Sequence, residues 1–314
     1  MSKRVAFVFS GQGAQVVGMG QDLAAKYPAV AELFREADVI LGRSLSRVMF
    51  EGPAEELVKT GTCQPALFVH GLACLAALRA ELGPVAPQFA AGLSLGEFTA
   101  HAAAGTFSFA LGLPLVAERG RLMQEACEQT TGSMAAMIGG EVADVQALAA
   151  ESGVDVANFN SPGQIVLSGP VAGIDAAVEG AKAKGIKKAV KLNVAGAYHS
   201  RLMKPAADAL VGVLGATPMQ QPDFPVMANF TARPVREPQE IRDTLAAQVT
   251  GSVRWTETVE YLVDVEKVEL IVELGPGGVI AGFVKRTRKE VPVIGISDCA
   301  TLEAAVAELR VALG

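Results

Sequence analysis

A serine between two glycines occupies the segment that most constrains the fold of this chain. Residues 91–97 read Ala-Gly-Leu-Ser-Leu-Gly-Glu, after an apolar run at 87–92 and before a helical pattern at 95–104. This pattern predicts a tight turn from a strand into a helix, with the Ser94 hydroxyl exposed and helix N–H groups directed at whatever it attacks. A nucleophile that carries an acyl group has this geometry. An ordinary glycine–serine turn would give the same short motif, so the choice between the two interpretations depends on the rest of the chain.

The chain can bury a large core. It has 314 residues, of which 50% are hydrophobic, and this length fits one large domain or two smaller ones. The formal net charge of −6 gives no reason to expect binding to nucleic acid. The first residues lead into a strand pattern and do not resemble a signal peptide. The apolar stretch 66–78 contains His70 and is followed by Arg79, so we expect no membrane span.

The four cysteines are scattered along the chain, at Cys63, Cys74, Cys127 and Cys299. Their spacing fits neither a metal site nor a dense disulfide framework. We therefore expect reduced thiols in a cytoplasmic protein that holds no metal.

Strand and helix patterns alternate through most of the chain, which predicts a parallel sheet covered by helices. Residues 5–9 form a strand pattern that leads into the glycine-rich loop 10–13 and then a helical pattern. The last third repeats the alternation, with a strand at 270–274, a turn at 275–278, a helix at 279–286, a strand at 291–296 and a helix at 302–313.

The middle of the chain has a different order. Its patterns predict a strand at 134–138, a helix at 142–150, strands at 154–159 and 164–167 around a turn at 160–163, a helix at 174–183 and a strand at 187–194. This βαββαβ order is typical of a ferredoxin-like unit. We therefore predict a small subdomain at 130–197, inserted into a core formed by residues 1–129 and 198–314.

Ser94 needs a base, because a free hydroxyl is a poor nucleophile at neutral pH. Of the three histidines, His199 is the best candidate for this base, because it directly follows the predicted subdomain and could face the turn across a cleft. A structural or surface role is the alternative. His101 lies seven residues after Ser94 on the same predicted helix, about 10 Å along its axis, which points its side chain away from the nucleophile. His70 lies in an apolar helical run and is expected to be a core residue.

Acyl transfer also needs N–H donors for a developing oxyanion. The backbone N–H of Leu95, directly after the serine, is one candidate. The loop Gly11-Gln12-Gly13 is another, because its backbone can approach a ligand closely. The same loop fits no nucleotide-binding motif: Val16 stands where Gly-x-Gly-x-x-Gly requires a glycine, and the chain has no Gly-x-x-x-x-Gly-Lys-Ser/Thr.

Taken together, these motifs resemble the malonyl-CoA:acyl-carrier-protein transacylase family, the acyltransferases of fatty-acid and polyketide synthesis. The resemblance covers nearly the whole chain, through Gly11-Gln12-Gly13-Ala14-Gln15, Gln64-Pro65-Ala66, residues 92–97, Arg119-Gly120, residues 158–164, His199-Ser200-Arg201-Leu202-Met203 and Glu273-Leu274-Gly275-Pro276-Gly277. It implies an α/β-hydrolase-like core with an inserted ferredoxin-like subdomain, in agreement with the order of the predicted elements.

The resemblance implies catalytic roles for five residues. Ser94 would be the nucleophile and His199 its base. Gln248 would stand where the family has the amide or backbone carbonyl that orients the histidine. The backbone N–H groups of Gln12 and Leu95 would form the oxyanion hole.

Three further residues would bind the substrate. Arg119, which taken alone is most simply a surface arginine, would hold the free carboxylate of a malonyl group. A guanidinium binds a carboxylate through two parallel hydrogen bonds, which a lysine cannot reproduce. The motifs around Gln64 and Asn160 would complete the substrate site.

The chain departs from the family pattern next to the nucleophile and before the glycine-rich loop. Leu93 stands where the family usually has histidine, which puts the lining of the acyl pocket in doubt but not the general base. Ser10 replaces the usual proline, which removes no N–H donor. Tyr198 follows Ala197 where the malonyl-type pocket usually has phenylalanine, and this favours malonate over branched extenders.

The implied reaction has two steps and forms a malonyl-serine. Malonyl-CoA loads the serine, and the phosphopantetheine thiol of acyl carrier protein then accepts the malonyl group. No metal or redox cofactor is needed, and a monomer is expected. Carrier proteins of this pathway are typically acidic, so exposed basic residues would dock them. The candidates are Lys187, Lys188, Lys285 and Arg286, with ordinary solvated charge as the alternative.

Other interpretations share parts of the pattern. A discrete acyltransferase that serves a polyketide synthase has nearly the same motifs. A serine esterase or lipase shares the turn, but it would usually add an acidic residue to the histidine and a His-Gly-Gly-Gly loop, which the chain lacks. A non-catalytic scaffold would be expected to have lost Ser94, His199 or Arg119.

Overall fold

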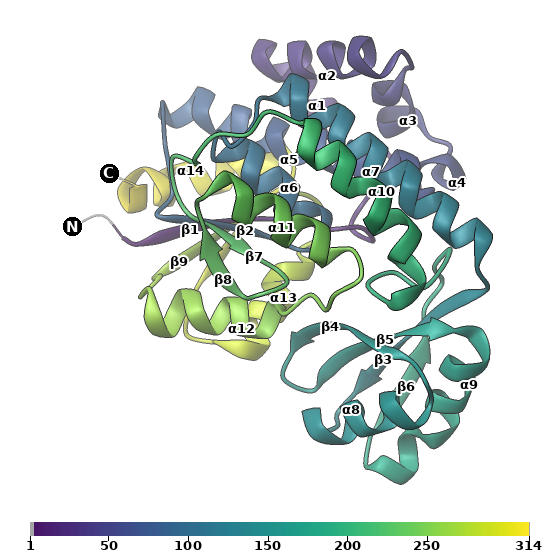
Figure 1. Ribbon diagram of the computed structural model, residues 1–314. Coiled ribbons are helices and arrows are strands. Elements are labelled where there is room, and N and C mark those ends of the chain that lie inside the picture. Colours follow the sequence, from purple (N-terminus) through teal and green to yellow (C-terminus); the bar gives the residue numbers. More distant parts are fainter. Residues whose placement is uncertain (1–2, 314) are drawn as a thin grey trace.

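Two β-sheets organise the chain into a large and a small lobe (Figure 1). This computed structural model describes residues 3–313. The large sheet contains β1 (Val5–Phe9), β2 (Phe89–Gly92), β7 (Val226–Ala228), β8 (Arg233–Val235), β9 (Leu270–Leu274) and β10 (Val293–Ile296). The small sheet contains β3 (Gly132–Ile138), β4 (Asp155–Ser161), β5 (Gln164–Pro170) and β6 (Lys188–Lys191).

The large sheet has the strand order β10-β9-β1-β2-β7-β8. Its pairs are parallel except for β7 with β8, which are antiparallel. Every residue of β1 is buried, as expected for a central strand that is covered on both faces. Val5, Phe7 and Phe9 point into one layer of the core, whereas Ala6 and Val8 point into the other.

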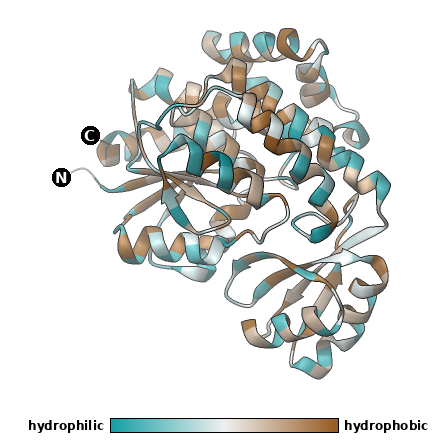
Figure 2. Cartoon of the chain, viewed as in Figure 1, coloured by the Kyte–Doolittle hydropathy of each residue, from teal (hydrophilic) through white to brown (hydrophobic). Residues whose placement is uncertain are grey.

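Helices cover both faces of the large sheet. One face packs against α12 (Trp255–Glu260), the short π-helix Tyr261–Val265 and α13 (Val279–Thr287). The other faces α1 (Gln21–Lys26), α2 (Pro28–Leu41), α3 (Leu45–Glu51), α4 (Ala54–Leu57), α5 (Thr60–Leu82), α6 (Leu95–Ala103), α7 (Phe109–Gln129), α10 (Lys204–Ala216), α11 (Pro238–Gln248) and α14 (Cys299–Leu313). In Figure 2 the strands of the large lobe are mostly hydrophobic, whereas outer helices such as α11 carry hydrophilic residues. The predicted α/β class, with a largely parallel sheet under helices, is therefore confirmed.

Helix α5 is long and apolar enough to cross a membrane by length and composition alone, contrary to our expectation for this stretch. Its most apolar window is 89% buried inside the protein. The helix therefore serves as a central core helix, which explains why it carries almost no polar surface. His70 on this helix is buried, as predicted, and its Nε2 lies 3.1 Å from the carbonyl oxygen of Ser297.

The small sheet has the order β4-β5-β3-β6, and its three strand pairs are antiparallel. The helices α8 (Val142–Glu151) and α9 (Val171–Gly180), with the 3₁₀ turn Ala181–Lys184, pack against one face. The other face is turned toward the large lobe and lines the central cleft. The βαββαβ order is as predicted, and its elements occupy Gly132 to Lys191.

Several predicted boundaries in this lobe were wrong. Asn160 and Ser161 belong to β4 and not to a turn, because pairing of Ser161 with Gln164 extends the ladder to the last two residues of the hairpin. Strand β6 ends at Lys191, three residues before the predicted end. The Leu192 N–H still donates to Met134 of β3, after which the chain leaves the sheet, and residues 192–195 line the cleft.

Differences elsewhere have local causes. Helix α14 begins at Cys299 and not at Leu302, because Asp22 accepts the Cys299 N–H and Asp298 accepts the Thr301 N–H. Strand β10 begins at Val293 and not at Val291. The strands β7 and β8 were not predicted, since three residues each are too few for a pattern.

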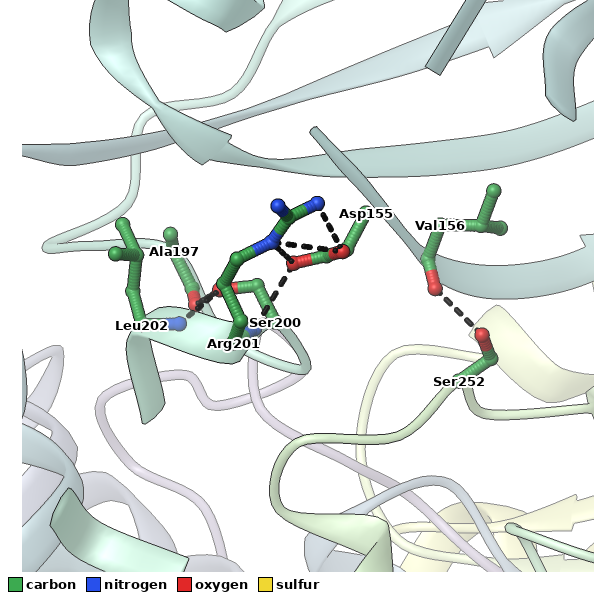
Figure 3. Close-up of polar contacts among 7 residues, drawn as sticks. All are labelled: Asp155, Val156, Ala197, Ser200, Arg201, Leu202 and Ser252. Carbon is green, nitrogen blue, oxygen red and sulfur yellow. Dashed lines mark hydrogen bonds and ion pairs between the residues drawn. The ribbon is translucent and has the colours of Figure 1, made fainter. Parts of the chain in front are cut away.

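The lobes are joined by contacts to the edge strand β4 (Figure 3). Asp155 accepts hydrogen bonds from the Arg201 backbone N–H at 2.9 Å and from the Arg201 guanidinium at 2.7 Å. Ser252 donates to the Val156 carbonyl oxygen at 2.6 Å. Val253 lies beside β4 and exchanges backbone hydrogen bonds with Ala157 and Phe159. Because Arg201 and Val253 lie close in sequence to His199 and Gln248, these contacts place the small lobe directly beside the candidate site.

Candidate active site

The turn at Ser94 has the strained geometry of a nucleophile that a fold holds in place. Ser94 lies between β2 and α6 with φ of 55°, in the region that residues with a side chain rarely adopt. Gly92 and Gly96 are required on either side. A Cβ on Gly92 would lie 2.0 Å from the backbone of Gly96, and a Cβ on Gly96 would lie 2.2 Å from the Phe9 carbonyl oxygen. The glycines therefore allow the turn to pack directly against β1.

His199, the predicted base, lies in contact with Ser94. Its Nε2 atom lies 2.7 Å from Ser94 Oγ, and its Nδ1 atom lies 2.8 Å from the backbone carbonyl oxygen of Gln248. A carbonyl only accepts, so Nδ1 carries the proton and Nε2 is free to receive the serine proton. The orienting group is thus the backbone of Gln248, one of the two forms that the sequence left open.

The loop that carries His199 is held in place by the Ser200 hydroxyl group. His199 has φ of 53°, and the next residue, Ser200, donates to the Ala197 carbonyl oxygen at 2.6 Å and accepts from the Leu202 N–H at 3.2 Å. Figure 3 shows these contacts beside the Arg201–Asp155 pair. The histidine is therefore held from both sides of its backbone.

Burial lowers the pKa of His199 to about 4, and the positive charge of Arg119 acts in the same direction, while the hydrogen bond to Gln248 opposes both. His199 is 4% exposed. The imidazole is therefore neutral at neutral pH, which is the form that can accept a proton from Ser94.

Arg119 is a buried cation beside the nucleophile and not a surface residue. It is 1% exposed, and its Nη2 atom donates to Ser94 Oγ at 3.1 Å and to Gln248 Oε1 at 2.9 Å. Its Nη1 atom donates to Gln64 Oε1. Gly120 explains the Arg-Gly motif, because a Cβ there would lie 2.9 Å from the Thr60 carbonyl oxygen and would keep α7 away from α5.

The guanidinium can receive an anion in the cleft. Burial lowers the pKa of Arg119 to about 10, so the group stays charged at neutral pH. Within residues 3–313 the cation forms no ion pair with a carboxylate. A buried charge whose hydrogen-bond partners are two neutral amides and a hydroxyl is suited to an incoming carboxylate.

The two predicted oxyanion donors lie at the same cleft. Gln12 and Leu95 both line it, and within residues 3–313 their N–H groups donate to no acceptor. Gly11 brings the loop close, because a Cβ there would lie 2.3 Å from the Leu93 carbonyl oxygen. Their N–H groups are therefore available for an oxyanion at Ser94.

The cleft has a volume of about 550 Å³ and is lined by both lobes. Gln64 and Asn160 line it as predicted, and Asn160 Oδ1 is buried without a partner within the described part of the chain. Leu93 also lines the cleft, and part of its side chain packs against the α12–α13 layer of the core. His101 does not face the cleft, since it is buried and its Nδ1 pairs with Thr106 Oγ1 at 3.0 Å.

Two residues of the site were not found from the sequence. Asn229, after β7, accepts the Ser94 N–H at 2.7 Å and donates to the Gly92 carbonyl oxygen at 2.8 Å. Glu97, which stands in the nucleophile motif itself, is fully buried and accepts hydrogen bonds from Gln248 and from the backbone of Asn229. An acidic residue on the apolar face of the α6 pattern was the signal that could have revealed Glu97.

A family model described as an acyl transferase domain matches residues 6–308. The chain belongs to the acyl transferase family. Malonyl CoA-acyl carrier protein transacylase of Bacillus subtilis is 42% identical over 99% of this chain and 98% of its own length. The protein of the same name from Escherichia coli K12 is 41% identical over 96% of this chain and 98% of its own length.

Solved structures agree with the sequence relatives. The malonyl CoA-acyl carrier protein transacylase of Coxiella burnetii is 34% identical, covers 99% of both chains and superposes with a TM-score of 0.95. A malonyl-transacylase solved in complex with a type II polyketide acyl-carrier protein is 39% identical, with a TM-score of 0.93 over 97% of this chain and 99% of that chain.

In this acyl transferase the four predicted docking residues gather at one end of the small sheet. Lys187 and Lys188 are exposed, and the Lys187 N–H donates to the Gly139 carbonyl oxygen, while Gly139 in turn donates to Gly163 in the β4–β5 turn. Arg286 on α13 reaches the same hairpin through hydrogen bonds to Ser161 and Gln164. Lys285 beside it is exposed.

Proposed function

We propose that this acyl transferase moves a malonyl group from malonyl-CoA to the phosphopantetheine thiol of acyl carrier protein, for fatty-acid synthesis. The observation that carries the proposal is the buried guanidinium of Arg119, 3.1 Å from the nucleophilic oxygen of Ser94. The names of the full-length relatives support the same substrate and partner.

In the first half-reaction, Ser94 Oγ attacks the thioester carbonyl while His199 Nε2 takes the hydroxyl proton. The N–H groups of Gln12 and Leu95 stabilise the oxyanion. The C–S bond then breaks, and His199 returns the proton to the departing CoA thiolate. The malonyl ester stays on Ser94 with its carboxylate paired to Arg119.

The second half-reaction reverses these roles. His199 takes the proton of the carrier thiol, the thiolate attacks the serine ester, and the proton returns to Ser94 Oγ as the C–O bond breaks. Substrate and product are both thioesters, so the exchange needs no metal or redox cofactor. A backbone carbonyl stabilises imidazolium less than a carboxylate would, which suits a reversible acyl shuttle.

Finer features of the protein are proposed on the same basis. The strand–Ser94–helix turn supports describing the core as α/β-hydrolase-like, with residues 130–197 as the inserted subdomain and residues 1–129 and 198–314 as the core. We also propose a monomer in the cytoplasm.

A discrete acyltransferase for a polyketide synthase is the second candidate. Polyketide biosynthesis protein ThaF of Burkholderia thailandensis is 41% identical over 90% of this chain, but the match spans 24% of that protein. Relatives matched over their whole length favour the fatty-acid enzyme. An esterase is disfavoured because His199 is oriented by a carbonyl and not by a carboxylate.

The test is mass spectrometry of the intact protein mixed with malonyl-CoA, followed by holo carrier protein. The proposal expects an adduct of one malonyl group that the carrier removes as malonyl-carrier. An adduct lost to water at the same rate with and without carrier would indicate a hydrolase. The absence of an adduct would refute malonyl-CoA as the acyl donor.

Malonyl loading is expected to be nearly independent of pH between about pH 6 and pH 8. Only neutral His199 can act as the base, so the rate falls as pH drops through its pKa, which burial and Arg119 lower to about 4. Single-turnover loading by rapid quench would show the acid limb below pH 6, with circular dichroism confirming the fold at each pH. A limb centred near 6.5, the ordinary histidine value, would contradict this environment for His199.

Reversing two docking charges is expected to weaken the carrier reaction alone. In a Lys187→Glu, Lys285→Glu double variant, the KM for carrier protein should rise about tenfold, because steering of an acidic partner depends on these exposed charges. Loading from malonyl-CoA should be unchanged, since neither side chain lines the cleft. Lys26→Glu, at an exposed lysine of α1 that pairs with Glu303, is the control for a charge change outside this surface. An unchanged KM for carrier would refute docking at this surface.

A further inference from the structure

A buried carboxylate lies beneath the nucleophile and has no role in the proton transfers above. Glu97 is 0% exposed, and its Oε2 atom accepts hydrogen bonds from the Asn229 backbone N–H at 2.9 Å and from Gln248 Nε2 at 2.6 Å. Its Oε1 atom is buried without a hydrogen-bond partner within residues 3–313. Within residues 3–313, Oε2 therefore accepts both hydrogen bonds of this side chain.

The two residues that Glu97 holds are those that hold Ser94. Asn229 Oδ1 accepts the Ser94 N–H at 2.7 Å, and Gln248 Nε2 donates to the Ser94 carbonyl oxygen at 3.0 Å. Ser94 needs such support because its φ of 55° is unfavourable. A strained backbone persists only where surrounding contacts determine it strongly.

Glu97 also fixes which way the Gln248 amide faces. The amide nitrogen faces two acceptors, Glu97 and the Ser94 carbonyl, while the amide oxygen accepts from Arg119 at 2.9 Å. If the amide were flipped, its NH₂ group would face the N–H groups of the Arg119 guanidinium, so that donors would face donors. Glu97 is therefore one of three groups, with the Ser94 carbonyl and Arg119, that set the orientation of the Gln248 amide.

We propose that Glu97 is a positioning residue, whose Oε2 atom holds Asn229 and Gln248 so that Ser94 and Arg119 take their reactive orientations. The part that concerns Arg119 rests on the proposed function. The part that concerns Ser94 does not.

The acceptor at Oε2, and not the negative charge, does the positioning. Burial raises the pKa of Glu97 to about 7, against the opposing hydrogen bonds and the charge of Arg119. Because Oε2 already accepts two hydrogen bonds, the proton of the neutral acid belongs on Oε1, and both contacts survive protonation. Glutamine offers an amide oxygen at the same reach without charge. Aspartate keeps the charge but is one methylene shorter.

The experiment compares Glu97→Gln with Glu97→Asp. Each variant is measured for melting temperature, for the rate at which a fluorophosphonate labels Ser94, and for kcat/KM of loading from malonyl-CoA and from acetyl-CoA. Glu97→Gln should stay within about threefold of the parent in every rate. Glu97→Asp should lose about 10- to 100-fold in labelling and in malonyl loading, because small displacements of reacting groups have effects of this size. Its preference for malonyl over acetyl should fall as well.

Glu273→Asp is the matched control. Glu273 is also fully buried and accepts two backbone N–H groups, from Ile280 and Ala281 at the start of α13. Its shortening should lower the melting temperature without changing the malonyl-to-acetyl ratio.

Two results would overturn the proposal: parent-like rates in Glu97→Asp, or a Glu97→Gln variant as impaired as Glu97→Asp. If the parent does not load malonyl-CoA, the proposed function fails, while fluorophosphonate labelling still tests the effect of Glu97 on Ser94.

Discussion

Ser94→Ala is expected to lower malonyl transfer by about 10⁴- to 10⁶-fold, because the acyl group loses its covalent attachment point. Intact-mass analysis should show no malonyl adduct on the variant under conditions that load the parent fully. The fold should survive, since Ser94 Oγ makes its contacts to His199 and Arg119 and not to the core. Equal melting temperatures would confirm this.

Two controls make the Ser94 result specific. The His199→Ala variant keeps Ser94 but lacks its base, so it should accept the malonyl group slowly, and a faint adduct is expected after long incubation. Ser200→Ala removes a neighbouring hydroxyl that faces the backbone and not Ser94, and it should still load. An adduct of parental intensity on Ser94→Ala would place the nucleophile elsewhere.

Arg119→Ala is expected to abolish the preference for malonyl-CoA. The guanidinium is buried, so a malonyl carboxylate in the variant would be desolvated without a cationic partner, at a loss of about 10²- to 10³-fold in kcat/KM. Acetyl-CoA carries no carboxylate and should react as well as in the parent or better. Loading rates for both thioesters, measured with the same enzyme samples, give the ratio directly.

Arg119→Lys separates charge from geometry. A lysine keeps one positive charge but cannot bind both carboxylate oxygens or reach Gln64 and Gln248 together, so an intermediate ratio is expected. A malonyl-to-acetyl ratio that stays at the parental value in both variants would assign carboxylate recognition to another residue.

The local sequence was enough to predict the turn that carries Ser94. Gly92 and Gly96 are needed by backbone contacts that a Cβ would prevent, so the motif itself specifies the geometry. The alternation of strand and helix patterns likewise predicted the parallel sheet and the βαββαβ order. In both cases the local sequence pattern reflects a direct requirement of the packing.

Other parts depend on long-range contacts that leave little trace in the sequence. Strand β7 has three residues and is defined mainly by its place beside β2, and Asn229 reaches Ser94 only because of that place. The proline and glycine that follow Asn160 predict a turn there, whereas the ladder to β5 keeps Asn160 in β4. The group that orients His199 is the backbone carbonyl of Gln248. Every residue has such a carbonyl, so the sequence could not show whether the backbone or the side-chain amide orients the histidine.

The two chain crossings between the lobes lie side by side. A Cβ on Gly132, where the chain enters the small lobe, would lie 2.7 Å from Ala197, where it returns, and a Cβ on Gly196 would lie 2.4 Å from Cys127 Sγ. An insertion whose ends meet leaves the host sheet unbroken, so it can be exchanged as a module. Such an exchange would replace one wall of the cleft, including Asn158, and leave Ser94 and its partners in place. The side chains around Ser94 and one wall of the cleft therefore lie on different lobes.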